Sequence, residues 1–379
     1  MQLHMESARE WVWRNGPSSW RDAAAIVLTL GTILVVGIGA RQMVGPFATA
    51  RPDLISLSPV VLPLYTLRTV LRMLAALAAS LVFTLTYATL AAKSRRAEMV
   101  LIPLLDVLQS VPILGYLSFT VLFFVGLFPG SMLGPELAAI FAIFTSQAWN
   151  MAFSFYQSLR TLPADLDEAS RSFRSSSWQR FWRLEVPFAM PGLVWNMMMS
   201  MSGGWFFVVA AEAIAVGDLR IDLPGVGSYV ARAIQAQDLA AVGWAVAAMT
   251  LAILLYDQLL FRPLVAWADK FRFEQTAAQI VPRSWVLEVF RRSEVAARIG
   301  APIGRLLGRA AHARLAFLPS LYLPARLNLP RATVDAAWIA LIAGTSLFVL
   351  VTLARRASAV LGWGKLPAVG VSPCCASWC

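Results

Sequence analysis

Long apolar runs separated by short charged segments dominate this chain. A membrane-crossing α-helix needs about 20 apolar residues, and six runs are near or above that length. They are Ala23–Ala40, Val70–Ala92, Met99–Phe128, Leu137–Tyr156, Phe188–Val216 and Leu239–Phe261. We expect the third run to break near Pro112 and Gly115 and to bend there toward a pathway. The pattern predicts an all-α, polytopic transmembrane helical bundle with these six core spans.

Composition excludes an ordinary soluble domain. Hydrophobic residues make up 58% of the 379 positions, only 14% are charged, and the mean hydropathy is +0.65. The net charge of +11 would also suit a nucleic-acid-binding protein. The Lys and Arg residues, however, lie mostly in short segments beside apolar runs, as the positive-inside rule requires. The lipid bilayer is therefore the expected environment, and nucleic acid is not an expected partner.

Charge also predicts the orientation of the spans. The first run follows several arginines and has no convincing cleavage site, so we interpret it as an uncleaved anchor with a cytoplasmic N-terminus. Alternation then places Lys93–Glu98, the segment around Glu168 and Arg262–Arg272 in the cytoplasm, in agreement with their charges. Asp218–Asp238 falls outside, with a tight loop before a short helix. Four arginines at or beyond the outer boundary weaken the agreement: Arg41, Arg51, Arg68 and Arg72.

A basic segment, Asp165–Pro187, interrupts the apolar runs. Pro163 and Asp165 favour a helix start. One helix face then carries Leu166, Ala169, Ser170 and Phe173. After the small polar turn Ser175–Ser177, a second short helix has an aromatic side and a basic side, formed by Trp178, Phe181 and Trp182 and by Arg180 and Arg183. Two short amphipathic helices in one loop predict a docking surface; the alternative is an ordinary basic cytoplasmic loop.

This loop resembles that of the inner-membrane permease subunits of ATP-binding-cassette (ABC) importers. The family pattern is Glu-Ala-Ala, three residues, Gly, nine residues, then Ile-x-Leu-Pro. Here the same spacing carries Glu168-Ala169-Ser170, then Arg174, then Leu184-x-Val186-Pro187. Arg174 is the main departure, because Gly permits a left-handed turn that costs another residue about 1 kcal/mol. We expect the turn either to slide onto Ser175 and Ser176 or to change its geometry.

The resemblance covers about Leu64 to Glu274. PLLDVLQSVP, at Pro103–Pro112, and Ser202–Gly227 look like the nitrate, sulfonate and taurine branch, whose usual substrate is a small anion. The resemblance implies a type I importer permease in the bacterial inner (plasma) membrane. It also implies three kinds of partner: ABC ATPase subunits, a periplasmic or anchored substrate-binding protein, and a second permease unit, in a homodimer or a tandem pair.

The resemblance also implies which residues contact the ATPase. Leu166, Ala169, Phe173 and Trp178 would be apolar anchors in a groove of the ATPase, with Glu168 as an oriented charge. Ser170, Arg174, Leu184 and Pro187 complete the motif. The chain itself has no G-x4-GK[ST] loop, no H-E-x-x-H pair and only two histidines. We therefore expect a transport subunit that is not an enzyme and needs no cofactor or metal, with ATP bound by a partner.

Polar residues inside spans are candidates for the translocation pathway, because hydrocarbon disfavours them. The candidates are Asp106, Gln109, Ser200, Ser202, Gly203, Trp205 and Glu212. The alternative is hydrogen bonding between packed helices, which is as good an explanation for Gln147 and Asn150 and a better one for Asn196. An ion- or proton-coupled secondary carrier, with Asp106 and Glu212 as coupling carboxylates, remains the alternative function.

The pattern divides the chain into four parts. Residues 1–63 hold the first span and an external loop, residues 64–274 the permease domain with its loop at 157–187, residues 275–332 a basic linker, and residues 333–379 a seventh span, Ala336–Leu353, with an atypical tail. Ser284–Ile299 in the linker is either a basic amphipathic helix on the membrane surface or a solvated segment.

The seventh span looks like the start of a second permease unit. We therefore hypothesise a truncation, or a frame shift near Leu361, which would also allow a non-transporting remnant. Cys374, Cys375 and Cys379 cluster in the tail, but they lack the His or acidic neighbours of a metal site.

Overall fold

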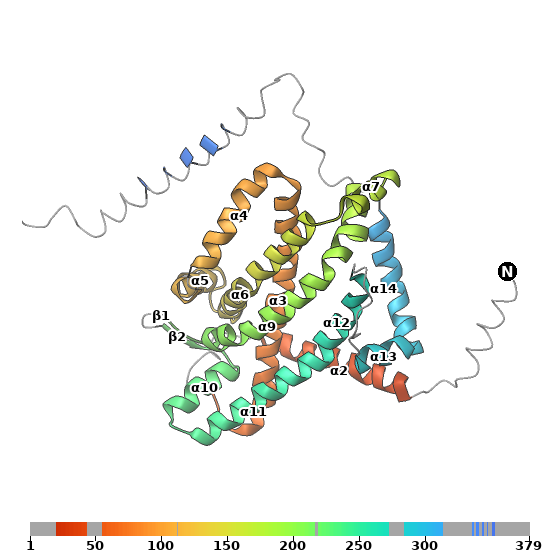
Figure 1. Cartoon of the computed structure of the whole chain (residues 1–379). Coiled ribbons are helices and arrows are strands. Elements are labelled where there is room, and N and C mark those ends of the chain that lie inside the picture. The colour runs from red at the N-terminus through yellow and green to blue at the C-terminus, as the bar shows by residue number, and fades with distance from the viewer. Residues whose placement is uncertain are drawn as a thin grey trace, which may run out of the picture. The chain divides into compact units, whose positions relative to one another are not determined.

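The computed structural model describes residues 20–43, 55–111, 113–216, 219–272 and 284–313, with isolated positions between 336 and 352. These ranges, apart from the isolated positions, belong to one compact unit, Met1–Phe317. Helices dominate it (Figure 1). Among the described residues, five helical segments are long and apolar enough to cross a membrane: Asp22–Arg41, Pro59–Lys93, Leu133–Arg160, Ser177–Glu212 and Leu239–Phe271. The predicted helical membrane bundle is confirmed.

Three helices form the centre of the bundle. They are α3 (Leu62–Lys93), α6 (Leu133–Arg160) and α9 (Val186–Glu212), and α6 packs between the other two. Alanines such as Ala76 and Ala189 in the buried cluster let the backbones approach closely. Larger side chains fill the remaining space, among them Met73, Ile143, Met151, Phe155, Leu193 and Met201. The bundle thus joins segments that lie far apart in the sequence.

The predicted third span is two helices. α4 (Arg95–Ser110) and α5 (Ile113–Leu127) are separated at Val111, whose backbone is extended, with φ −75° and ψ 124°. The next residue is a proline, which disfavours helical geometry in the residue before it and has no N–H to donate. The expected break is therefore confirmed at this position, but not at Gly115, which lies inside α5. The run Met99–Phe128 therefore forms two helices that meet at the expected break.

The loop after α9 contains a small hairpin. β1 (Ala213–Val216) pairs antiparallel with β2 (Leu219–Asp222), in the register Ala213 with Asp222 and Val216 with Leu219. The fifth span therefore ends at Glu212, and its predicted end at Val216 was wrong. The expected short helix is present as α10 (Val226–Gln235), followed by α11 (Leu239–Tyr256), a π-helical turn (Asp257–Phe261) and α12 (Arg262–Ala268).

Three further helices lie at the side of this bundle. α2 (Trp20–Met43) precedes it, and α13 (Trp285–Arg292) and α14 (Glu294–His312) follow it. Ser284 and Ser293 cap α13 and α14, accepting hydrogen bonds from the backbone N–H groups of Leu287 and Ala296 at 3.4 and 3.2 Å. The single amphipathic helix considered for Ser284–Ile299 is thus interrupted at Ser293. The seventh run and the cysteine-containing tail lie outside the described residues, apart from isolated positions of that run.

Candidate functional site

The loop between α6 and α9 contains two short helices, as predicted. α7 spans Ala164–Ser172, and α8 spans Ser177–Arg180. The α8 helix continues through a π-helical turn (Phe181–Glu185) into α9. A capping box begins α8: Gln179 N–H donates to Ser176 Oγ at 3.2 Å, and Ser176 N–H donates to Gln179 Oε1 at 3.0 Å. We call residues 164–185 the coupling loop. Its second helix is joined to the core helix α9 without an interruption.

Arg174 occupies the turn between the two helices of the coupling loop. Its φ is +48°, so a residue other than Gly adopts the left-handed conformation at the Gly position of the motif. Its N–H donates to Arg171 O at 2.9 Å, and the N–H of Ser175 donates to Ser170 O at 3.3 Å. The turn has therefore not moved onto Ser175 and Ser176, and Arg174 itself adopts the left-handed conformation at a cost of about 1 kcal/mol.

The predicted contact residues differ in their accessibility. Phe173 is 83% exposed, and Glu168 and Ala169 are also exposed. Trp178 is half-buried and donates from Nε1 to the backbone oxygen of Ala310, in α14, at 2.6 Å. The remaining motif residues at the loop's face and base are half-buried: Leu166, Ser170, Leu184 and Pro187. Among the predicted contact residues, the exposed ones are thus Glu168, Ala169, Phe173 and Arg174.

Ion pairs fix the base of the coupling loop to α3. The carboxylate of Glu185, which is 3% exposed, lies 2.9 Å from Lys93 Nζ and 3.2 Å from Arg180 Nε. Arg180 also contacts Asp167 of α7 at 2.6 Å. Lys93 is the last residue of α3, so the base of the loop is joined to both α3 and α9. We did not predict Glu185, although an acidic residue just before an apolar run is a signal of such a pairing.

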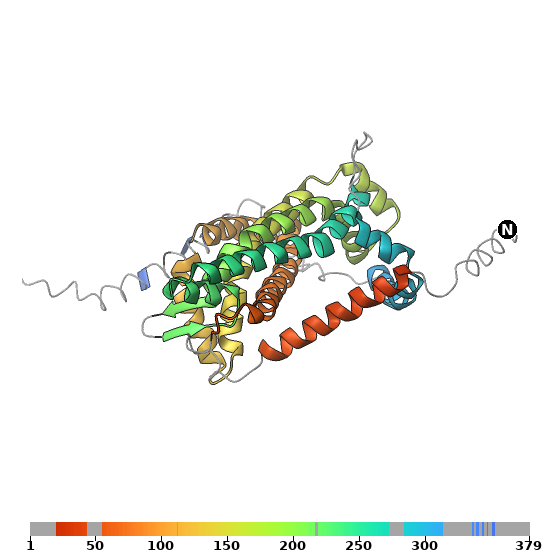
Figure 2. The same ribbon diagram turned by 90° about the horizontal axis from the view of Figure 1, so that it is seen from below.

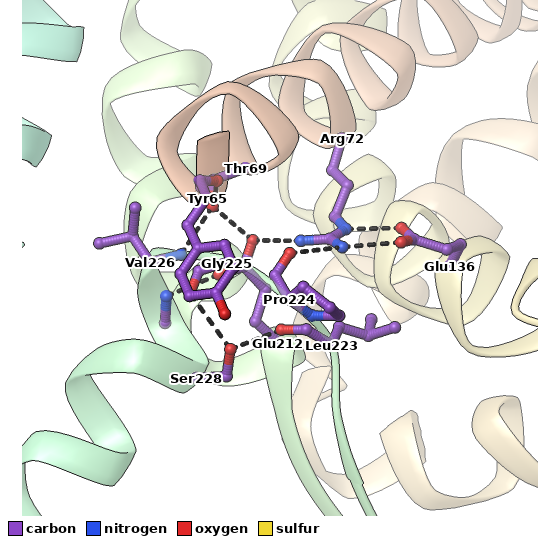
Figure 3. Close-up of polar contacts among 11 residues, drawn as sticks. Tyr65, Thr69, Arg72, Glu136, Glu212, Leu223, Pro224, Gly225, Val226 and Ser228 are labelled. Carbon is purple, nitrogen blue, oxygen red and sulfur yellow. Dashed lines mark hydrogen bonds and ion pairs between the residues drawn. The ribbon is translucent and has the colours of Figure 1, made fainter. Parts of the chain in front are cut away.

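A buried ionic cluster lies at the other end of the same helices (Figure 3). Arg72 of α3 is fully buried and bonds Glu136 of α6 in a bidentate fashion, at 2.6 Å from Nε and 2.7 Å from Nη2. Its Nη1 donates to Glu212 of α9 at 2.6 Å. One guanidinium therefore joins the three central helices, and its charge is compensated by two carboxylates. This pairing accounts for a fully buried arginine inside an apolar span.

The cluster also holds the segment between β2 and α10. Arg72 Nη2 donates to Pro224 O at 3.1 Å. Glu212 accepts hydrogen bonds from Thr69 Oγ1 and from Gly227 N–H, both at 2.6 Å. A Cβ atom on Gly225 would lie 2.3 Å from the carboxylate carbon of Glu212, so only Gly fits there. The segment between β2 and α10 is therefore locked onto α3 and α9.

Asp106 and Glu212, the two carboxylates considered for a carrier, lie in different surroundings. Glu212 is fully buried and already accepts from Arg72, Thr69 and Gly227. Asp106 lies on the exposed side of α4, where it accepts a hydrogen bond from Gln109 Nε2 at 3.1 Å. In the described part of the chain, the hydrogen-bond partners recorded for Asp106 and for Glu212 are different residues.

The α9 candidates lie on two faces. Ser200 is buried and donates to Gln147 O at 3.5 Å, and Trp205, 7% exposed, donates from Nε1 to Tyr256 OH at 3.1 Å. These two side chains belong to the packed core. Ser202 and Gly203 are exposed, and so are Trp195, Met199 and Phe206 at helical spacing from them. Ser202 and Gly203 thus lie on the exposed face of α9, whereas Ser200 and Trp205 face its packed side. Asn196 donates within its own helix, to Gly192 O at 3.0 Å.

Comparison with known proteins finds a family match for the central part of the chain. Residues 81–262, which include the coupling loop and most of the central bundle, match the family described as binding-protein-dependent transport system inner membrane component. This segment, just under half of the chain, is thus similar to ABC transporter permease domains. The matched family and the apolar helices indicate a multi-pass membrane protein of the bacterial inner membrane.

Three relatives of this segment are named for different solutes. The glycine betaine/proline betaine transport system permease protein ProW of Escherichia coli is 34% identical over 36% of this chain and 36% of its own length. The bicarbonate transport system permease protein CmpB of Synechococcus elongatus is 25% identical over 35% and 45%, and the nitrate import permease protein NrtB of Synechocystis is 25% identical over 30% and 39%. The chain thus spans less than half the length of these relatives.

Proposed function

We propose that this chain is the permease subunit of a binding-protein-dependent ABC importer. In this proposal it lines the translocation pathway together with a second permease unit and is driven by separate ATPase subunits. The coupling loop carries the proposal, because it presents an exposed Glu168 on α7 and an exposed Phe173 at the end of α7, and its base is fixed to the core. An apolar side chain that is 83% exposed at the end of a membrane bundle is suited to a groove in a partner.

The proposed mechanism is alternating access. When two ATP-bound ATPase subunits close, they push the coupling loop, which is continuous with α9 and tied to α3 through Glu185 and Lys93. At their other ends, α3, α6 and α9 are joined by Arg72 and its two carboxylates, together with the loop at Leu223–Ser228. The helices and the external loop would then rock as one body, as in domain movements of other proteins. A substrate-binding protein would deliver its cargo at the external loop.

The substrate class is proposed from shared chemistry. The sequence segments resemble those of the nitrate, sulfonate and taurine branch, whereas the relatives are named for glycine betaine, bicarbonate and nitrate. All of these solutes are small and carry a carboxylate or another oxyanion group. We therefore propose a small solute with one anionic oxygen group and exclude neither zwitterions nor simple anions.

Reconstitution tests this function. The chain, its cognate ATPase and binding protein would be placed in proteoliposomes, and uptake of labelled glycine betaine, bicarbonate, nitrate and taurine would be measured with and without ATP. We expect ATP-dependent uptake of one of these solutes that stops when the ATPase is replaced by a hydrolysis-deficient variant. Uptake that follows an ion gradient and needs no ATPase would contradict the proposal and support the carrier.

A further inference from the structure

The last turn of α14 lies against the second helix of the coupling loop. Trp178 donates from Nε1 to Ala310 O at 2.6 Å, and Gln179 donates from Nε2 to His312 O at 2.8 Å. The carbonyl groups in the last turn of a helix receive no hydrogen bond from an N–H group four residues later in the same helix. Another element therefore commonly donates to them. Two adjacent side chains of the coupling loop therefore cap α14.

The opposite end of α14 is fixed to α2. Ser293, between α13 and α14, donates from Oγ to Asp22 Oδ1 at 2.7 Å. Val286 and Val289 of α13 are buried where this helix packs against α2 and α12. Figure 2 shows α2 in the plane of the view and α14 nearly end-on beside the beginning of α2. With 19 residues, α14 bridges roughly 28 Å between α2 and the coupling loop.

α2 has few other contacts with the bundle. Its C-terminal part approaches α3 so closely that a Cβ atom on Gly39 would lie 2.0 Å from Leu71 Cδ1. Between this contact and the α13–α14 contact, large apolar side chains of α2 are exposed in the described structure, including Val27, Leu30, Ile33 and Leu34. Lipid suits such a surface. Within the described residues, α2 is thus held near its two ends.

We propose that α13 and α14 are a mechanical link that carries movement of the coupling loop to α2. This inference rests on the proposed function, because the movement comes from an ATPase docked on that loop. The link uses Trp178 and Gln179, whereas Glu168 and Phe173 remain exposed for the ATPase. α2 precedes the matched permease residues 81–262, and α13 and α14 follow them. The link therefore makes a peripheral span part of the moving body.

The first test loosens the link at the coupling loop. The double variant Trp178→Phe, Gln179→Glu removes both donors but keeps the aromatic ring and the oxygen that accepts in the capping box. Hydrogen exchange of the full chain would be measured by mass spectrometry in phosphatidylcholine/phosphatidylglycerol nanodiscs, without an ATPase. We expect the amides of α14 to exchange roughly tenfold faster, because two hydrogen bonds are lost. Trp182→Phe, a neighbouring change outside these bonds, is the control; equal exchange in both variants would overturn the proposal.

The second test breaks the link at α2. Ser293→Asp keeps a capping oxygen for α14 but places a carboxylate against Asp22. We expect faster exchange in α7 and α8, although they lie at the far end of α14, and a several-fold loss of ATP-driven uptake with the ATPase still bound. Ser284→Asp, which changes the cap of α13 in the same way, is the control.

The outcomes separate this inference from the proposed function. Unchanged exchange in α7 and α8, or changed exchange with undiminished uptake, would overturn the link while leaving the importer intact. If the wild-type chain binds no ATPase, the proposed function fails, and the link to the ATPase fails with it, whatever the exchange data show.

Discussion

Replacing Arg72 by methionine should strongly destabilise the bundle. The guanidinium is fully buried and makes three contacts of 2.6–2.7 Å with two carboxylates. Its loss leaves Glu136 without its two hydrogen bonds from Arg72, and leaves Glu212 with those from Thr69 and Gly227 only. Breaking a buried ion pair by removing one partner costs about 3–5 kcal/mol, because a charge stays buried without compensation. For a bundle of this size we expect the melting temperature to fall on the order of 10 °C.

The assay is heat denaturation of the detergent-solubilised chain, with the remaining folded fraction measured by size-exclusion chromatography. Arg262→Met is the matched control, because its ion pair with Asp257 is 57% exposed on the Arg262 side and contributes at most about 1 kcal/mol. Adding Glu136→Met to Arg72→Met should restore part of the loss, since it removes one of the uncompensated charges. If Arg72→Met melts together with the Arg262→Met control, the cluster does not join the three helices energetically.

Three further changes test other parts of the structure. Gly225→Ala should lower the same melting temperature, since its Cβ would meet the Glu212 carboxylate, whereas Gly243→Ala has nothing within 4 Å; equal stability of the two would contradict this. Arg174→Gly should relieve up to about 1 kcal/mol of strain and slow hydrogen exchange in α7 and α8, and faster exchange would count against a strained turn. Glu185→Gln should reduce ATP-driven uptake more than ATPase binding, because the exposed docking face is unchanged; a parallel loss of both would show that Glu185 only maintains the fold.

Local features of the sequence predicted the coupling loop well. Its helix starts and its motif spacing are determined within about twenty contiguous residues. The left-handed conformation of Arg174 was not expected, because we had expected the turn to move onto Ser175 and Ser176 or to change its geometry. The hairpin was not predicted. Ala213–Val216 continues an apolar run, and a short apolar segment alone does not distinguish the end of a helix from a strand.

Contacts between distant segments were not predictable in this way. Arg72 pairs with Glu136 and Glu212, which are 64 and 140 residues away along the chain. An arginine inside an apolar run does signal that a buried acid must exist, but the sequence does not say which one. Glu212 was accordingly interpreted as a pathway residue. Trp178 was considered only as an anchor for the ATPase, because its bond to Ala310 joins positions 132 residues apart.

The most direct test of the central claim is co-purification of the tagged chain with its cognate ATPase from membranes. Glu168→Lys combined with Phe173→Ala changes two exposed residues of the coupling loop and leaves its packed base intact. Trp244→Ala, which removes an aromatic ring that is 56% exposed on α11, is the control. We predict that the wild type and the control retain the ATPase while the double variant, folded and present in equal amount, loses it. Equal recovery of the ATPase with all three chains would contradict the assignment of this loop as the coupling site.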